Sequence, residues 1–362
     1  MISIKSALFG LAAVTIASVA SVATDVSVAS AETMLRYTDG GPNRGTRAAA
    51  QNFFAKEVER LSGGDLKIEI HWGGALLKWK AALGGIGAGT ADMGAVLAAY
   101  APNQLKALAI GDLPLNNSDA WVGMRAMYEL MTTNKELQAS LAKQNVVYIG
   151  NFTTTAVQFE CAGDHKINTV ADIKGKKMRA SGVYAKVLND LGANMVSMTY
   201  GKVYQALDSG LIECSAGYFY ANRAYKLYEV VNRITRVDWG QISGFAIAVN
   251  KDVWGDLSAK QQQVLLEAGS NMTDHFAKLQ IDGIESTVAG MTSGKIGRKV
   301  EVVTMAEEER QKLFAAAQPY VNNWVGDMKK AGFNGQQIWD QFQSLIAKYT
   351  KERDAKGYPW VR

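Results

Sequence analysis

The sequence predicts a bilobal α/β protein, in which two α/β domains are joined by crossing strands and a long domain-spanning helix, and close like a clamshell. Three observations predict this fold. The chain has 362 residues, more than one hydrophobic core comfortably holds. Segments with strand and helix patterns alternate, as they do in parallel α/β sheets. Residues 257–291 keep one helical pattern, which at about 1.5 Å per residue is long enough to lie across both domains.

The first 31 residues have the layout of a secretory signal peptide. Lys5 precedes an apolar stretch over residues 7–20, and a run of small residues ends at Ala31. We predict cleavage after Ala31, with a cut after Ala23 as the alternative. A membrane anchor is the weaker interpretation, because the apolar stretch is shorter than the roughly 20 residues that a spanning helix needs. The mature chain is therefore expected to be exported.

The first domain is predicted to begin with strand and helix units that follow one another directly. The expected strands are 34–39, 66–72 and 91–100, and the expected helices are 46–64, one within 73–89, and two within 118–145. Apolar residues at helical spacing and glycine stops predict the helices, and the largely apolar third strand is typical of a buried parallel sheet. The run 146–161 has strand composition and is long enough to cross between domains.

A second set of units predicts the other α/β domain. Thr169 and Asp172 have the spacing of a capping box for a single helical turn. The expected strands are 176–181 and 194–199, the expected helices are 182–193 and 200–210, and residues 211–220 form a strand or a loop.

The remaining chain returns to the first domain and then ends in the second. Residues 244–254 have strand character, and Ser258 and Gln261 form a capping box at the start of the long helix. After a further short strand, Thr304 and Glu307 predict another capping box, followed by the C-terminal helices. We therefore predict domain I over 32–156 plus 244–285, and domain II over 157–243 plus 286–362.

Charge and cysteine content narrow the function classes. The net charge of +5 steers small anions mildly, and the basic residues are scattered among 34 acidic ones, so nucleic acid is not an expected partner. The two cysteines, Cys161 and Cys214, fit a disulfide in an exported chain. A metal site is the weaker alternative, because the thiols are far apart in sequence and the three histidines share no helix-face spacing. We expect no metal and no cofactor.

Arg179 is the leading candidate for a binding residue. It ends an expected strand, directly before Gly182 and a helix whose N-terminal N–H groups point to the same place. A guanidinium group matches a carboxylate or sulfonate with two parallel hydrogen bonds, and a helix N-terminus also favours an anion. Because most arginines are surface ion-pair residues, the pattern alone leaves the two interpretations about even.

Three segments carry a resemblance to a known family. They are "INTVADIKGKKMRASG" (167–182), "LGANMVSMTYGKVYQALDSGLIECSAG" (191–217) and "NKDVWGDLSAKQQQVLLEA" (250–268). In this order they resemble the solute-binding subunits of TRAP transporters, the tripartite ATP-independent periplasmic carriers of the DctP type, and the resemblance covers essentially the whole mature chain. It implies the clamshell of periplasmic binding proteins. In that family the arginine of the KGxKxR segment binds the substrate's carboxylate, a role that falls here on Arg179.

The resemblance also implies a location and partners. We expect a periplasmic monomer without enzymatic activity that captures a small organic anion, a carboxylate or sulfonate, in the interdomain cleft. It would deliver this ligand to the TRAP membrane permease subunits.

Two departures from the family pattern affect the ligand. Many members have a further arginine in the crossing strand, where this chain has Gln158 and Phe159, which weakens the dicarboxylate and sialic-acid interpretations. The family's usual Asp-Gly after the VYxAL helix is here Glu213-Cys214. Family variants with cysteines at both places imply a disulfide between Cys161 and Cys214 that braces the cleft wall.

Further candidate residues follow expected strands, where open α/β sheets place ligands. They are Asn43, Arg44, Trp79, Tyr100, Asn151, Phe152, Gln158, Phe159, Tyr218, Tyr220 and Trp239. Each alone is more often a packing or surface residue. Together they predict a cavity with one anion anchor, hydrogen-bonding amides and aromatic walls.

Two other function classes share some of these features. An exported ligand-sensing domain has the same fold, since fold does not fix function. An exported enzyme acting on a small organic acid is less favoured, because the sequence has no nucleophile elbow, P-loop, HExxH or dinucleotide fingerprint. The Gly-rich residues 84–89 end a helix rather than open one.

Overall fold

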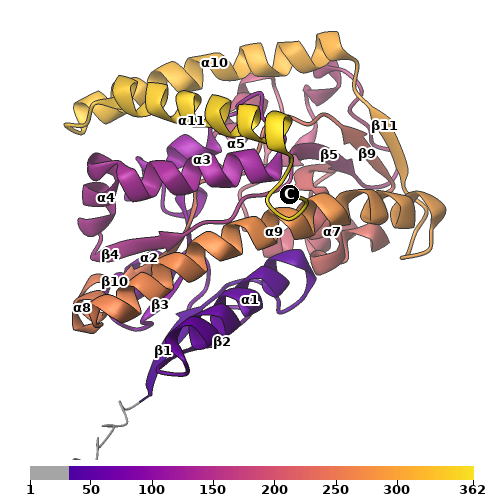
Figure 1. The fold of residues 1–362 in the computed structure, drawn as a ribbon. Coiled ribbons are helices and arrows are strands. Elements are labelled where there is room, and N and C mark those ends of the chain that lie inside the picture. The colour runs from indigo at the N-terminus through magenta and orange to yellow at the C-terminus, as the bar shows by residue number, and fades with distance from the viewer. Residues whose placement is uncertain (1–31) are drawn as a thin grey trace, which may run out of the picture. The chain divides into compact units, whose positions relative to one another are not determined.

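The structure is a computed structural model, and it describes residues 32–362. The predicted signal peptide and its cleavage after Ala31 lie outside the described residues. Two mixed β-sheets with packed helices make up the described chain (Figure 1). The predicted fold class is therefore confirmed.

The first sheet contains five strands in the order β2-β1-β3-β10-β4. These strands are β1 (Thr33–Thr38), β2 (Leu66–His71), β3 (Met93–Leu97), β4 (Val146–Gly150) and β10 (Phe245–Asn250). β1 pairs in parallel with β2 and β3, whereas β10 is antiparallel to both β3 and β4. The late strand β10 thus lies inside a sheet built by the first 150 residues.

The second sheet contains six strands in the order β11-β9-β5-β8-β6-β7. They are β5 (Val157–Cys161), β6 (Lys177–Arg179), β7 (Asn194–Met195), β8 (Cys214–Tyr218), β9 (Arg233–Arg236) and β11 (Glu301–Thr304). β5 is antiparallel to its neighbours β8 and β9, and β6 is parallel to β8 and β7. Strand β9 was not predicted, and β7 is shorter than expected.

Helices connect and cover these strands. They are α1 (Gly45–Ser62), α2 (Ala82–Gly87), α3 (Ala120–Thr133), α4 (Lys135–Ala142), α5 (Gly182–Asp190), α6 (Val203–Asp208), α7 (Phe219–Tyr225), α8 (Lys251–Asp256), α9 (Ala259–Ser293), α10 (Glu307–Lys330) and α11 (Gly335–Lys356). No helix of residues 32–362 has the length and apolar character needed to cross a membrane.

The chain passes between the two sheets three times. Residues 151–156 lead from β4 to β5, and residues 237–244 lead from β9 back to β10. The 35-residue helix α9 then runs from α8 to β11 (Figure 1) and contacts α1 and α3 as well as α7. The expected strand run 146–161 is therefore two strands, one in each sheet, and the long helix is confirmed.

Alternating side chains of β10 supply two hydrophobic cores. Ile247 and Val249 belong to the core under α1 and α9, whereas Ala246 and Ala248 belong to the core under α3 and α4. Successive strand residues point to opposite faces, so a continuously apolar strand is buried on both sides. This burial fixes the first sheet between two helical layers.

The C-terminal helices pack on the first sheet's outer layer. Trp324, Met328 and Phe342 join the core that contains α3 and α4, and α11 contacts α3 directly. Helix α10 also contacts α5, which follows β6 of the second sheet. The division into two domains stays a prediction, since these helices contact elements of both sheets.

Two of the three predicted capping boxes are present in the structure. Ser258 caps α9 by accepting from the backbone N–H of Gln261 at 3.2 Å, and Asp172 accepts from the backbone N–H of Thr169 at 2.9 Å. The capping box at Thr304 is wrong, because α10 begins at Glu307 with Ala306 as its N-cap. Alanine has no side-chain acceptor, and the acidic first turn of α10 favours the helix start electrostatically instead.

Candidate functional site

A cavity lies where strand ends of both sheets meet. The first sheet and the segments around it supply Arg47, Trp79, Leu97, Ala99, Tyr100 and Phe245, and the second supplies Arg179, Ser181, Tyr200, Tyr218, Tyr220 and Tyr225. Phe152, Thr154 and Ile242 come from the two segments that cross between the sheets. The cavity has a volume of about 40 Å³.

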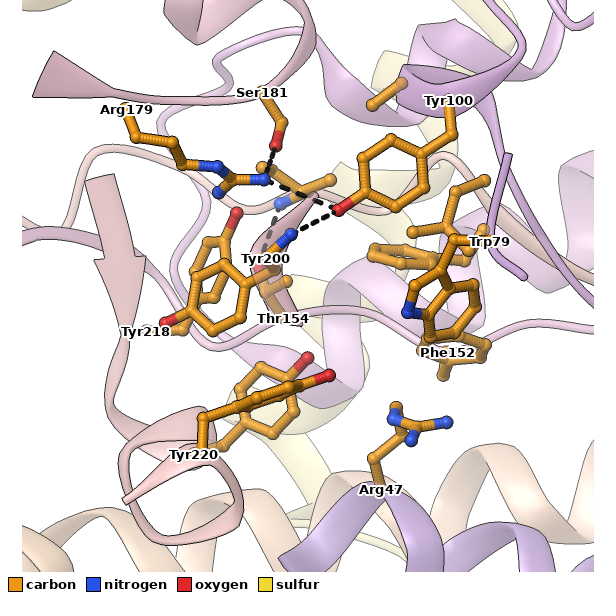
Figure 2. A pocket seen from close by; sticks show the side chains of 15 residues that line it. Arg47, Trp79, Tyr100, Phe152, Thr154, Arg179, Ser181, Tyr200, Tyr218 and Tyr220 are labelled. Atoms are coloured by element: carbon orange, nitrogen blue, oxygen red, sulfur yellow. Dashed lines mark hydrogen bonds between the residues drawn. The ribbon is translucent and has the colours of Figure 1, made fainter. Parts of the chain in front are cut away.

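Arg179 ends β6 and reaches the cavity from the second sheet. Its side chain is fully buried, although arginine is rarely so. Nη2 donates to Ser181 Oγ at 2.5 Å and to Tyr100 Oη at 3.4 Å (Figure 2). Nε donates to Met198 O at 3.3 Å. The guanidinium group also lies over the Tyr200 ring, 5.1 Å from its centroid.

One guanidinium nitrogen of Arg179 has no acceptor. Nη1 is buried and makes no hydrogen bond within the described residues. A buried donor without an acceptor costs about 1–3 kcal/mol, more when the group is charged. An anionic ligand in the cavity would remove this cost, because a carboxylate can accept from a guanidinium group at short range.

Tyr100 links the two sheets beside Arg179. It follows β3 of the first sheet, and its hydroxyl oxygen accepts from the backbone N–H of Tyr200 at 2.9 Å (Figure 2). Tyr200 comes from the second-sheet segment before α6. This hydrogen bond holds the two walls of the cavity together.

Arg47 is a second buried guanidinium group on the lining. It comes from α1, and its Nη1 donates to Asp39, which is fully buried after β1. Its guanidinium group lies 5.8 Å from the Trp72 ring and 5.5 Å from the Trp79 ring. Burial lowers the pKa of Arg47, but the charge and hydrogen bond of Asp39, together with smaller contributions from Tyr220 and Tyr225, outweigh burial and raise this pKa, so the arginine stays charged.

Tyrosine rings form much of the wall next to Arg179. The rings of Tyr200 and Tyr218 lie 5.2 Å apart, and those of Tyr200 and Tyr225 meet edge to face at 5.1 Å. Burial raises the pKa of Tyr218 and Tyr220 well above the usual range, and that of Tyr225 to about 12. These hydroxyls stay protonated, so they can donate hydrogen bonds to a ligand.

A buried carboxyl group lies on the same face of the second sheet as Arg179. The register aligns Glu160 of β5 with Ser215 of β8, and Ser215 with Arg179 of β6. Glu160 Oε1 accepts from Asn222 Nδ2 at 2.7 Å. Burial raises the pKa of Glu160 to about 8, and the hydrogen bond from Asn222 and the charge of Arg179 offset this only in part.

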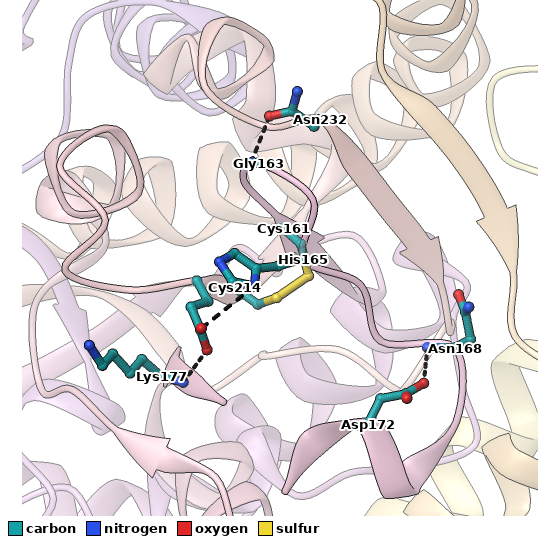
Figure 3. Close-up of a disulfide and its surroundings, with 9 residues drawn as sticks. Cys161, Gly163, His165, Asn168, Asp172, Lys177, Cys214 and Asn232 are labelled. Atoms are coloured by element: carbon teal, nitrogen blue, oxygen red, sulfur yellow. Dashed lines mark hydrogen bonds and ion pairs between the residues drawn. A yellow bond between two sulfur atoms is a disulfide. The ribbon is translucent and has the colours of Figure 1, made fainter. Parts of the chain in front are cut away.

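The predicted disulfide is present, and it joins β5 and β8, the strands that contain Glu160 and Ser215. Cys161 and Cys214 are directly opposite in the β5–β8 ladder and are bonded (Figure 3). Next to the disulfide, Glu213 accepts from the backbone N–H of Lys177 at 2.8 Å, which ties β6 to the same region. The disulfide thus braces the strands that position Glu160, Ser215 and Arg179.

Six predicted site residues come together around the cavity. They are Arg179, Trp79, Tyr100, Phe152, Tyr218 and Tyr220. Five of them lie at or within three residues of a strand end, whereas Trp79 lies in the loop between β2 and α2, and Figure 2 shows all six converging from different segments. Their placement agrees with the principle that ligands bind near the carboxyl ends of strands.

The two buried amides among the candidates lie elsewhere. Gln158 holds the loop after β9, with Nε2 donating to Asp238 Oδ1 at 2.7 Å and Oε1 accepting from Val237 N at 2.7 Å. Asn151 accepts from Tyr148 Oη at 3.0 Å and donates to Met124 O at 3.3 Å. Both amides therefore satisfy internal backbone and side-chain groups.

The other four candidates also lie outside the cavity. Phe159 is buried against Trp239, with ring centroids 6.2 Å apart, and Trp239 packs on Tyr184. Asn43 and Arg44 are exposed. Asn43 accepts from Asn52 Nδ2 at 3.1 Å, and Arg44 donates to the backbone oxygen of Ala224.

Sequence reasoning missed several residues of the site. On the lining they are Arg47, Ser181, Tyr200 and Tyr225, and Glu160 lies behind the lining in the same row as Arg179. A cation in the first turns of α1 and an acid inside the apolar strand "VQFEC" were the available signals. Both are unusual at positions whose pattern predicts burial.

The site offers few groups for catalysis or metal binding. Within residues 32–362, no three His, Cys, Asp or Glu side chains are grouped to hold a metal ion. The lining is dominated by two arginines, hydroxyl groups and aromatic rings. This chemistry can bind an anion and shield it from water.

Comparisons with known proteins identify the family. Residues 41–327 match the profile of DctP, bacterial extracellular solute-binding protein, family 7. The C4-dicarboxylate-binding periplasmic protein DctP of Rhodobacter capsulatus is 26% identical over 266 residues, which cover 71% of this chain and 76% of that protein. A monocarboxylate 2-oxoacid-binding periplasmic protein of Nostoc is 26% identical over 255 residues, 66% of each chain. The chain spans about half, 48%, of a solute-binding protein of Chromohalobacter salexigens, with 26% identity over 165 residues.

Solved structures share the fold. A TRAP solute-binding protein from Rhodoferax ferrireducens, in complex with copurified benzoate, superposes with a TM-score of 0.78 at 22% identity, covering 88% of this chain and 99% of that one. DctP6 of Bordetella pertussis, which binds pyroglutamic acid, gives 0.76 at 23% identity over 86% and 100%. Proteins of this family and these neighbours bind ligands for transport and are not enzymes. The chain belongs to the DctP family of bacterial extracellular solute-binding proteins.

Proposed function

We propose that this protein captures a small organic anion in the periplasm and delivers it to the membrane subunits of a TRAP-type secondary transporter. The observation that carries the proposal is Arg179, which is fully buried on the cavity lining with Nη1 lacking an acceptor. Relatives that bind monocarboxylate 2-oxoacids or C4-dicarboxylates support the same ligand chemistry.

The ligand's carboxylate or sulfonate would pair with Arg179. The protein atoms that accept hydrogen bonds from Arg179 are Ser181 Oγ, Tyr100 Oη and Met198 O. All three are uncharged, so the positive charge of Arg179 remains available to an anionic ligand. Attraction between opposite charges is stronger in a buried site than in water. Closure of the two lobes would therefore strengthen the pair by excluding water.

A thermal-shift screen against an organic-acid library tests the proposal. A ligand present at 100 times its dissociation constant stabilises the folded protein by about 2.7 kcal/mol, which is readily measured. Hits would then be assayed for chemical turnover, and unchanged ligand agrees with a binding protein. A screen without any stabilising acid would contradict the proposed function.

Replacing the anchor is the first prediction. Arg179→Ala is expected to weaken binding of the best hit at least thirtyfold, because truncating a buried charge-assisted pair costs about 2–5 kcal/mol. Isothermal titration calorimetry measures the loss, and circular dichroism checks the fold. Arg60→Ala is the matched control, since that side chain is 64% exposed and pairs with Glu57 on α1. Near-native affinity of the Arg179→Ala variant would show that the anchor is elsewhere.

A further inference from the structure

Two buried arginines line the cavity from different sides. Arg179 comes from the second sheet and Arg47 from α1, and Figure 2 shows their guanidinium groups separated by the aromatic side chains of the cavity. In the part of the chain that the structure describes, Arg179 Nη1 and Arg47 Nη2 are both buried without a hydrogen-bond partner. Each arginine therefore has one unpaired terminal nitrogen that can donate to a ligand in the cavity.

The two arginines differ in net charge. Arg47 donates to Asp39, whose other oxygen accepts from the backbone N–H of Gly41 at 2.6 Å. Asp39 is fully buried and does not line the cavity, so Arg47 and Asp39 form a nearly neutral pair with one donor left over. Arg179 has only uncharged groups within hydrogen-bond distance, so it keeps its positive charge.

Glu160 does not cancel the positive charge of Arg179 near neutral pH. It lies two strands from Arg179 and is held by Asn222. Because burial raises the pKa of Glu160 to about 8, its carboxyl group is largely uncharged at pH 7. The end of the cavity near Arg179 is thus cationic, and the end near Arg47 is close to neutral.

We propose that the cavity selects a monoanionic acid that carries an uncharged oxygen at its far end, with the carboxylate at Arg179 and the hydroxyl or carbonyl oxygen at Arg47. This inference rests on the proposed function and narrows its ligand class. A neutral oxygen accepts from Arg47 Nη2 without meeting the charge of Asp39. A second carboxylate at that position is repelled by Asp39, so dicarboxylates bind less well.

The side chains in the middle of the cavity determine how polar the central part of the ligand can be. Phe152 and Phe245 pack with ring centroids 4.4 Å apart, and Trp79 lies beside Tyr100 at 6.3 Å. These rings, together with Leu97 and Ile242, offer no charged group to the ligand's central part. An apolar carbon skeleton therefore joins the two oxygen-bearing ends.

Two matched series of acids test the selectivity by isothermal titration calorimetry at pH 7. One consists of benzoate, 3-hydroxybenzoate and isophthalate, and the other of butanoate, 4-hydroxybutanoate and succinate. In at least one series the hydroxy acid is expected to bind more tightly than both the unsubstituted acid and the diacid. Its advantage over the unsubstituted acid should be about tenfold, because this is the scale of one hydrogen bond to a charged group. Tightest binding by a diacid, or equal binding of all three members, overturns the inference.

Failure of the inference and failure of the proposed function give different results. If the six acids do not bind but other acids in the library do, the selectivity inference is wrong and the proposed function stands. If no acid in the library binds, both are wrong.

Variants of the arginine–aspartate pair provide the sharper test. Asp39→Asn removes the compensating charge and retains an oxygen for the Gly41 N–H, so it is expected to raise isophthalate or succinate affinity about tenfold relative to the hydroxy acid. Arg47→Met is expected to reduce the affinity ratio of hydroxy acid to unsubstituted acid to about one. A purely structural role for the pair would leave both affinity ratios unchanged.

A folding control keeps the test decisive. Arg47→Met leaves Asp39 buried and unpaired, which destabilises the fold. The double variant Asp39→Asn/Arg47→Met removes both charges together, and circular dichroism checks that it is folded. Retention of the hydroxy-acid preference in this double variant would overturn the role of Arg47.

Discussion

Arg179 and Glu160 are buried on one face of the second sheet with Ser215 between them. Strand pairing alone places the three side chains in a row, because residues directly opposite in neighbouring strands point to the same face. Gly217 leaves the room for this arrangement, since a Cβ atom there would lie 1.9 Å from Glu160 Oε2. The second sheet therefore buries the carboxyl group of Glu160 in the same row as Arg179, and the two side chains do not form an ion pair.

Glu160 predicts a pH dependence of stability. Its pKa is raised from 4.5 to about 8 in the folded protein, mainly by burial. Between these values the unfolded carboxyl group is ionised while the folded one keeps its proton, so the free energy of unfolding falls as pH rises from about 4.5 to 8 and then levels off.

Glu160→Gln is expected to remove this contribution, which is on the order of a few kcal/mol. Urea unfolding of the variant and the native sequence at pH 5, 7 and 9 measures the difference. Asp112, whose pKa burial raises to about 7, contributes in the same direction in both proteins and so cancels in the comparison. Parallel pH profiles of the two proteins would show that Glu160 is not protonated in the fold.

At the scale of elements, the disulfide joins two neighbouring antiparallel strands of the cavity wall. Cys161 ends β5 and Cys214 begins β8, and the bridge closes a sequence separation of 53 residues that includes β6, α5 and α6. Closing such a loop restricts the unfolded chain, in the entropic description of disulfide stabilisation. The strand pairing itself is also held by the β5–β8 ladder.

Removing the disulfide is therefore expected to lower stability more than it alters the fold. The double variant Cys161→Ser/Cys214→Ser should lose about 2–4 kcal/mol of unfolding free energy. Chemical denaturation measures this loss, and the native sequence reduced with dithiothreitol serves as the matched control. Equal stability of the oxidised protein and the double variant would mean that the bridge does not stabilise the fold.

On the scale of the whole molecule, Tyr100 is a direct contact between the walls that the two sheets provide. Its hydroxyl oxygen accepts from the backbone N–H of Tyr200 and from Arg179 Nη2. The covalent connections between the sheets are residues 151–156, residues 237–244 and the path through α9. A hinge at these crossings would open the cavity once the Tyr100 contacts break.

Tyr100→Phe tests this closure. The variant keeps the ring but leaves the Tyr200 N–H without its acceptor, so ligand affinity is expected to fall about tenfold. Small-angle X-ray scattering should show a larger radius of gyration for the ligand-free variant than for the native sequence. If affinity and radius both stay the same, Tyr100 does not hold the closed form.

Much of the fold could be predicted because its signals are local. Ser258 and Gln261 mark the start of α9 within four residues, and the apolar spacing of Leu265, Met272 and Phe276 marks its buried face. The start of α10 was misplaced because Thr304 offered the right spacing while the strand β11 extends through it. Strand pairing competes with a capping box, and sequence spacing does not reveal which prevails.

By itself the sequence determined the alternating α/β elements, the long helix and the position of Arg179 at a strand end before a helix, since each depends on residues close together in the chain. The cysteine pair was also foreseen, through the family resemblance. The tertiary structure decided which side chains join Arg179. Arg47, Tyr100 and Glu160 come from distant segments, and their meeting depends on strand order, register and helix rotation, which long-range packing sets.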